Sequence, residues 1–180
     1  MEQLTITEAL SEIQLVTKKI AKKQTDMMGH LVRMTHVKDP FESEGGSYAH
    51  NDKEHQAIRD LNKRLVSLRA AISKANTDNK LTIGDTERTI FEWLAWKKEV
   101  ATNYLNFVKS VYATTKTTLE NAAARPQVIK DEATGATKLI ECVANVDYPK
   151  WLKEYETQQD TLGKLDGQLS LKNATIVINF

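Results

Sequence analysis

The chain has 180 residues, of which 41% are hydrophobic and 27% are charged, and its formal net charge is +1. A chain of this length can bury a core of its own, whereas a charge so close to zero gives no overall field that attracts nucleic acid or an anionic membrane. The single cysteine, Cys142, excludes an internal disulfide. No apolar run reaches the roughly 18 residues that a membrane helix needs. We therefore expect no membrane contact and no sequence-specific nucleic-acid binding.

Residues 1–34 have the pattern of an amphipathic helix. Thr5 and Glu8 have the spacing of a capping box, in which each side chain satisfies a free backbone N–H at the helix start. Apolar residues then recur every seven positions, at Ile6, Ile13, Ile20 and Met27. A basic cluster follows the middle of the segment, at Lys18, Lys19, Lys22 and Lys23. We interpret this cluster as a solvated helix face, with a contact for a phosphate-rich ligand or an acidic partner as the alternative.

Residues 35–51 lose this periodicity, and Asp39-Pro40 and Gly45-Gly46 mark an irregular loop. Loops of this length are usually functional or mobile. Polar side chains crowd its end, at His50, Asp52, Glu54 and His55. Two histidines five positions apart share a helix face poorly, and no further ligand stands at a recognisable spacing. We therefore expect no metal and no cofactor, and keep a metal site as the alternative.

Residues 52–125 carry the strongest pattern and predict a long antiparallel helical hairpin. Its first arm has one apolar seam at alternating steps of three and four, formed by Ile58, Leu61, Leu65, Leu68, Ile72 and Ala75. A polar turn over 76–80 leads to a second arm from about Thr86 to Ala124, with Asp85 as its N-cap. The apolar face of this arm holds Ile90, Leu94, Ala101, Leu105, Val108 and either Val111 or Tyr112. Trp93 and Trp96 lie beside that face, packed in a core or stacked on a planar ligand.

Residues 126–146 predict a β-hairpin with a glycine-containing turn. An isolated two-stranded hairpin is marginally stable in water, so it must pack on the helices or pair with another chain. Residues 147–180 predict a last helix and a C-terminal strand. An unpaired apolar strand invites aggregation, so we expect this one to join a sheet within the chain or in a neighbour. The residues expected to mediate self-association are Thr175, Ile176, Val177, Ile178 and Phe180.

The sequence thus predicts one mainly α-helical domain over residues 1–180: a long antiparallel helical hairpin or bundle with a small β-hairpin and a C-terminal strand. Three segments also carry a family resemblance. They are Ile-Ser-Lys-Ala-Asn at 72–76, Gly84 followed by Thr-Ile-Phe-Glu-Trp-Leu-Ala-Trp-Lys-Lys at 89–98, and the closing Leu165-Asp166, Leu169, Asn173 and Thr175. Together they resemble the septicolysin-like family of small helical proteins from bacteria and their phages. The resemblance implies a helical fold and a phage origin, but no reaction.

The chain shows no sequence motif of an enzyme. It has no nucleophile elbow and no phosphate-cradling glycine loop, and Cys142 lies in a predicted strand among apolar neighbours, where a thiol is more often packed than reactive. Long seams and a strand-like tail are typical of a subunit that buries surface against its copies. We therefore expect a non-enzymatic, self-associating structural or assembly protein, a phage virion component such as a head, neck or tail protein. Its expected partners are its own copies and other virion proteins, in the virion or the host cytoplasm.

The alternative function is an oligomeric phage protein that sequesters a nucleotide-type immune signal. Basic, amide and aromatic side chains near the predicted hairpin turn would then line a binding site. The candidates for this ligand or partner contact are Arg69, Lys74, Asn76, Asn79, Trp93 and Lys97. Asn76 could instead serve only to cap the helix that ends there.

Overall fold

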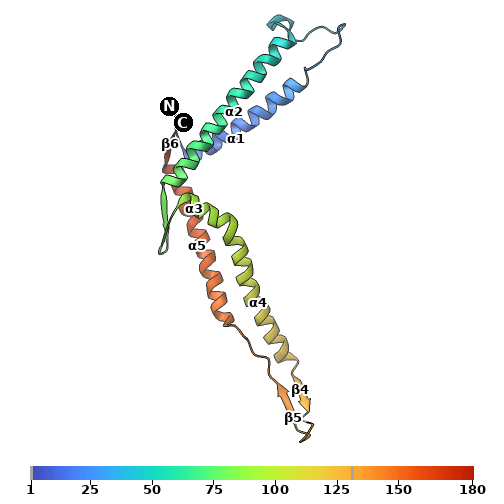
Figure 1. Cartoon of the computed structure of the whole chain (residues 1–180), viewed down its shortest axis with the longest axis vertical. Helices are drawn as coiled ribbons and strands as arrows, with labels where there is room; N and C mark the ends of the chain where they lie inside the picture. Colours follow the sequence, from blue (N-terminus) through green and yellow to red (C-terminus); the bar gives the residue numbers. More distant parts are fainter. Residues whose placement is uncertain (1, 131) are drawn as a thin grey trace. The chain divides into compact units, whose positions relative to one another are not determined.

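The computed structural model describes residues 2–130 and 132–180, and these are mainly α-helical, as the sequence predicted. The chain divides into two compact units, not the single domain expected (Figure 1). Unit 1 comprises Met1–Lys80 and Gln168–Phe180, and unit 2 comprises Leu81–Gly167. No helix in the described parts of the chain is both long enough and apolar enough to cross a membrane.

Unit 1 is built on two helices packed side by side, α1 (Ile6–Met28) and α2 (Gly46–Asp78), with a 3-10 turn, η1 (Glu42–Glu44), in the loop between them (Figure 1). The predicted capping box is confirmed: the Thr5 hydroxyl accepts from the Glu8 N–H at 3.2 Å, and the Glu8 carboxylate accepts from the Thr5 N–H at 2.8 Å. α1 ends at Met28, so the helix is shorter than the predicted 1–34 segment.

The core of unit 1 contains the predicted seam of α2. Ile58, Leu68 and Ala75 are buried, and the remaining seam residues are partly buried and pack against them. The matching stripe comes from α1, where the buried residues are Ile6, Ala9, Ile13, Val16 and Ile20. The prediction had paired α2 with residues 86–124, which belong to unit 2. The heptad-spaced stripe of α1 is the partner instead, because it presents apolar side chains at the same repeat.

Both ends of α2 differ from the prediction. The helix begins at Gly46 and not near Asp52, and it continues to Asp78 through residues expected to form a turn. Gly45 and Gly46 have φ angles of 97° and 87°, a left-handed conformation that glycine adopts without steric cost. This glycine pair turns the chain into α2 earlier than the apolar periodicity of the helix indicates.

The C-terminal strand lies within its own chain. β6 (Val177–Asn179) pairs antiparallel with β1 (Gln3–Thr5), and Leu4 is opposite Ile178 in the register. Ile178 is only 4% exposed and belongs to the core of unit 1. Of the two pairings that the sequence left open, the one within the chain is therefore formed. The prediction that residues 175–180 mediate self-association loses its basis, an unpaired strand.

A β-hairpin that the sequence pattern did not predict follows α2, with strands β2 (Lys80–Ile83) and β3 (Thr86–Thr89), and all of it but Lys80 belongs to unit 2. Gly84 turns the chain with a φ of 58°, and Leu81 and Ile83 alternate into the core. The helix that follows, α3 (Ile90–Ala95), starts at Thr89, which forms a second capping box with Glu92. The predicted start at Thr86 with Asp85 as N-cap was therefore wrong, because those residues complete the hairpin.

A π-helical segment, η2 (Trp96–Ala101), joins α3 to α4 (Thr102–Ala124). The buried residues Trp93, in α3, and Ala101, the last residue of η2, lie eight positions apart, where a regular heptad would give seven. A π-helical turn accommodates this extra residue. The apolar face consequently differs from the prediction: Trp93 is 3% exposed and Leu94 is 38% exposed.

The predicted second β-hairpin is present as β4 (Gln127–Lys130) and β5 (Thr137–Ile140), paired from Gln127↔Ile140 to Lys130↔Thr137. The last helix, α5 (Tyr148–Thr175), follows close to its predicted start. It lies beside α4 (Figure 1), and aromatic pairs join the two helices, Phe107 with Trp151 at 5.6 Å and Tyr112 with Tyr148 at 6.1 Å between ring centroids. Unit 2 thus contains its own two-helix layer.

Candidate functional site

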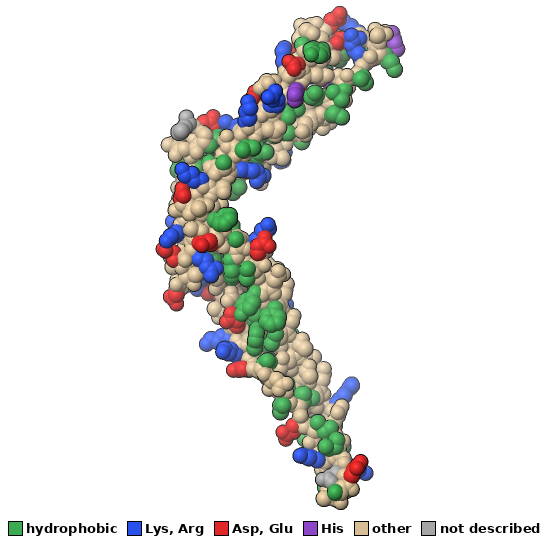
Figure 2. Space-filling view, in the orientation of Figure 1, with side chains coloured by type: hydrophobic (Ala, Val, Ile, Leu, Met, Phe, Trp, Pro, Cys, Tyr) green, Lys and Arg blue, Asp and Glu red, His purple; other side chains and the backbone are tan. Residues whose placement is uncertain are grey.

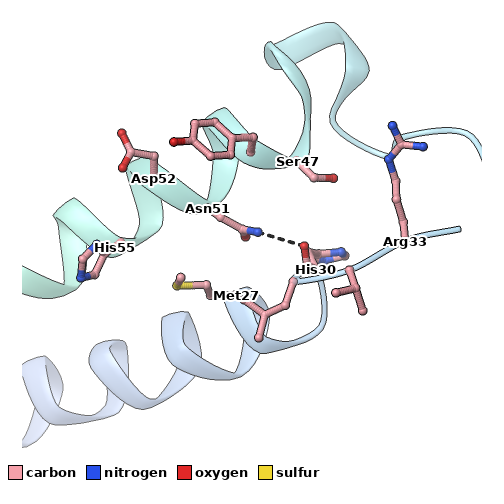
Figure 3. A pocket seen from close by; sticks show the side chains of 10 residues that line it. Met27, His30, Arg33, Ser47, Asn51, Asp52 and His55 are labelled. Atoms are coloured by element: carbon pink, nitrogen blue, oxygen red, sulfur yellow. Dashed lines mark hydrogen bonds between the residues drawn. The ribbon is translucent and has the colours of Figure 1, made fainter. Parts of the chain in front are cut away.

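The loop end of the α1–α2 pair contains a pocket of about 280 Å³, which we call the cap pocket (Figure 3). Side chains from the end of α1, the loop and the first turns of α2 line it: Met27, His30, Leu31, Val32, Arg33, Ser47, Tyr48, Asn51, Asp52 and His55. The Asn51 amide donates to the His30 carbonyl at 2.9 Å across the pocket. Its Oδ1 atom is buried and accepts no hydrogen bond among the described residues. A buried acceptor without a partner thus lies in the wall of the pocket.

Asp39 holds the loop on the first turn of α2. Its carboxylate accepts from the Ser47 hydroxyl at 2.6 Å, the Ser47 N–H at 2.9 Å and the Phe41 N–H at 2.9 Å. The Arg33 guanidinium lies 3.4 Å from the same carboxylate. The hydrogen bonds from Ser47, then that from Phe41, and the charge of Arg33 lower the pKa of Asp39 from 3.8 to about 2. Asp39 thus takes the place of an N-cap side chain, which Gly45 cannot provide.

We call the hydrogen bonds that the Asp39 carboxylate accepts from Ser47 and Phe41 the Asp39 tether, and we expect this tether to weaken in acid. The folded-state pKa of Asp39 lies below its unfolded value, so the stabilisation is fully present above about pH 4 and is lost as the pH falls through about 2. An NMR titration of the Asp39 carboxyl carbon should give a midpoint near 2. Ser47→Ala removes the hydroxyl donor and should raise this midpoint, whereas Ser43→Ala, in the same loop, should leave it unchanged. A wild-type midpoint near 3.8 would show that the tether is absent.

Two of the polar residues at the end of the loop, His50 and Glu54, pair with a ring and with a lysine. The ring of His50 stacks on Phe41 with centroids 3.6 Å apart, and the Glu54 carboxylate pairs with Lys23 at 2.8 Å. No group of three or more His, Cys, Asp or Glu side chains within 2–130 and 132–180 is arranged to hold a metal ion. The Glu54–Lys23 pair joins the loop end of α2 to α1, and His50 packs on the loop itself.

The six residues predicted to contact a ligand fall into both units. Arg69, Lys74, Asn76 and Asn79 belong to α2 and its C-cap, and two of them, Lys74 and Asn79, line a pocket of about 240 Å³ together with residues 176–179. The Asn79 amide donates to the Ala75 carbonyl at 2.8 Å and so serves to cap the helix. Asn76 lies within the last turn of α2 and not in a turn beyond it.

Trp93 and Lys97 belong to unit 2 and have structural contacts there. The Trp93 indole N–H donates to the Leu81 carbonyl at 3.0 Å, and the Arg88 guanidinium lies 4.9 Å from the centre of its ring. Because Trp93 is 3% exposed, its ring has no free face for a ligand. Lys97 pairs with Asp166. Trp93 is therefore no platform on which a planar ligand could stack.

A group of large apolar side chains is exposed on α4 and α5. We call it the aromatic face and define it by Tyr104, Phe107 and Trp151. Tyr104 is 38% and Phe107 54% exposed, and Trp151 is partly buried against Phe107. Together with Lys150 and Glu154, Tyr104 and Trp151 line a hollow of about 250 Å³. Figure 2 shows hydrophobic side chains gathered over this part of unit 2.

The β4–β5 hairpin is the second exposed apolar feature of unit 2. All residues of both strands are exposed, including Val128 at 59%, Ile129 at 53% and Leu139 at 54%. A two-stranded hairpin without a covered face is marginally stable alone. Cys142, which follows it, is exposed, so the prediction that this thiol is packed was wrong.

The described residues define a mainly α-helical protein with a cap pocket in unit 1 and an aromatic face and an uncovered β-hairpin in unit 2. Comparison of the chain with protein-family models, with curated proteins and with solved structures gave no match. The septicolysin-like resemblance therefore rests on the three sequence segments alone.

Proposed function

We propose that the protein is a non-enzymatic assembly protein that associates with copies of itself through unit 2. The observation that carries this proposal is the aromatic face, where Tyr104 is 38% and Phe107 54% exposed beside the partly buried Trp151. Contiguous exposed apolar surface on a protein commonly marks a site of contact with another macromolecule. The uncovered β4–β5 hairpin favours the same unit, because contact with another chain would stabilise it.

The biological setting that we propose is a phage virion, in which the protein would be a repeated component of the head, neck or tail. The septicolysin-like resemblance supports the phage origin, and the exposed apolar surface supports a role in assembly. Mass spectrometry of purified virions tests the setting: a virion component should be recovered in many copies, whereas its absence from intact particles would exclude this role.

Self-association has its own test. Multi-angle light scattering of the intact protein at tens of micromolar should give a mass of at least two chains of 20.3 kDa. Phe107→Ser should lower that mass, because it removes an exposed aromatic side chain from the contact surface. Tyr48→Ser is the matched control, since Tyr48 is 89% exposed but belongs to unit 1. A monomer mass for the wild-type protein at this concentration would overturn the proposal.

A further inference from the structure

The aromatic face has a specific arrangement of charge. Lys150 and Glu154 both line its hollow, and they stand one turn apart on α5. No ion pair joins them in the part of the chain that the structure describes. Glu154 accepts a hydrogen bond from the Gln158 amide at 2.9 Å, which leaves its negative charge in place. The hollow thus has a positive charge and a negative charge at successive turns of one helix.

We propose that a second copy of this chain docks on the aromatic face, with the two α5 helices antiparallel about a two-fold axis that passes between Lys150 and Glu154. The proposal rests on the self-association proposed above and names the surface and the geometry. A two-fold axis brings the same patch of both copies together, so a contact from one residue to another is always made twice. Lys150 of each copy would then face Glu154 of the other.

The charge arrangement favours a copy of this chain over an unrelated partner. A strongly acidic or basic partner would require one sign of charge around the hollow, whereas opposite charges on either side of an axis match themselves after a half-turn. The chain has a net charge of +1, so two copies approach without strong overall repulsion. The face is thus complementary to itself in charge.

The packing in unit 2 favours the same pairing. α4 and α5 form a layer of only two helices, and aromatic side chains stand at its surface and not between further helices. Two such layers placed face to face make a four-helix arrangement, a common way for paired helices to bury apolar side chains. Trp and Tyr are also enriched among residues that contribute most to binding, and here each is flanked by a charged rim.

Charge reversal tests the geometry directly. Lys150→Glu alone sets two carboxylates against each other at both cross-axis contacts, and Glu154→Lys alone sets two ammonium groups against each other there. Each variant should therefore self-associate about tenfold more weakly or worse. An equimolar mixture of the two variants should recover association, because one copy then carries both carboxylates and the other both ammonium groups, so each cross-axis contact joins a carboxylate to an ammonium group. The double variant Lys150→Glu/Glu154→Lys should also associate with itself. Sedimentation velocity across a concentration series gives the dissociation constants.

Lys153→Glu and Glu156→Lys are the matched controls, since both positions are exposed on the same helix but do not line the hollow. Circular dichroism should show unchanged helicity for all variants. Recovery in the double variant, with unchanged controls, supports the antiparallel contact. A wild-type oligomer whose dissociation constant stays within twofold on reversal of Lys150 or Glu154 would overturn this inference and leave the proposed function intact. A wild-type monomer would overturn both.

Discussion

Replacing Leu68 with alanine should lower the free energy of unfolding of unit 1 by about 2–5 kcal/mol. Leu68 is 0% exposed and lies at the centre of a core cluster that α1, α2 and β6 share. Its truncation removes apolar contacts and leaves a cavity that the packed helices can close only in part. Ile6, Ala9 and Ile13 from α1 would each lose a neighbour in this cluster.

Urea unfolding measured by circular dichroism at 222 nm checks this value, and Val66→Ala is the matched control. Val66 lies on the same helix but is 67% exposed, so its truncation should change the stability by less than about 0.5 kcal/mol. All three tryptophans, Trp93, Trp96 and Trp151, belong to unit 2, so their fluorescence reports separately on that unit. A loss below about 0.5 kcal/mol for Leu68→Ala would mean that the seam of α2 is not packed as described.

The sequence predicted those features that depend on local periodicity. The seam of α2 is buried where its three- and four-residue spacing required, and Thr5 caps α1 through Glu8. Such patterns lie within one helix and one turn, so they predict the buried positions without knowledge of the element that packs against them.

The helix that packs against α2 could not be predicted from such a local pattern. The apolar stripe on α1 and that on 86–124 both fit the seam, and spacing alone does not choose between them.

The β2–β3 hairpin and the π-helical segment were missed for a different reason. Lys80–Ile83 and Thr86–Thr89 are four residues each, too short for alternation to outweigh the helical pattern that follows. The extra residue in η2 then shifts the buried positions by one, which is why Trp93 and not Leu94 enters the core. A regular repeat cannot anticipate that shift, because it is set by packing against the rest of unit 2.

The candidate sites were the least predictable part of the structure. Asp39 and Ser47 are eight residues apart and meet because Gly45 and Gly46 adopt positive φ angles, a conformation that the sequence permits but does not require. The aromatic face combines Tyr104 and Phe107 from α4 with Trp151 from α5, and these become neighbours only through the packing of two helices. The glycine pair and the polar side chains at the end of the loop, Asp52 and His55 among them, were the signals in the sequence that pointed to the cap pocket.

Replacing Ile178 with alanine should destabilise unit 1 by about 2–5 kcal/mol, an effect as large as that expected at Leu68. Ile178 is 4% exposed, lies opposite Leu4 in the β1–β6 register and packs in the same core cluster as Leu68. Val177→Ala is the matched control, because Val177 is 54% exposed on the same strand. Urea unfolding at 222 nm should therefore separate the truncations at these two neighbouring positions by more than about 1 kcal/mol.

Deleting residues 176–180 should impair the folding of unit 1 more than it impairs self-association. The deletion removes β6, exposes the part of the core that Ile178 covers, and takes from the Ile6 N–H its acceptor, the Ile176 carbonyl at 3.1 Å. The sequence alone predicted the opposite, that the tail serves assembly and that deleting residues 175–180 would weaken assembly more than it alters helicity. Because β6 is paired within the chain, we expect the truncated protein to lose helical signal at 222 nm and to unfold at lower urea concentration. A truncated protein with wild-type stability that fails only to associate would contradict the β1–β6 pairing and restore the tail as an assembly element.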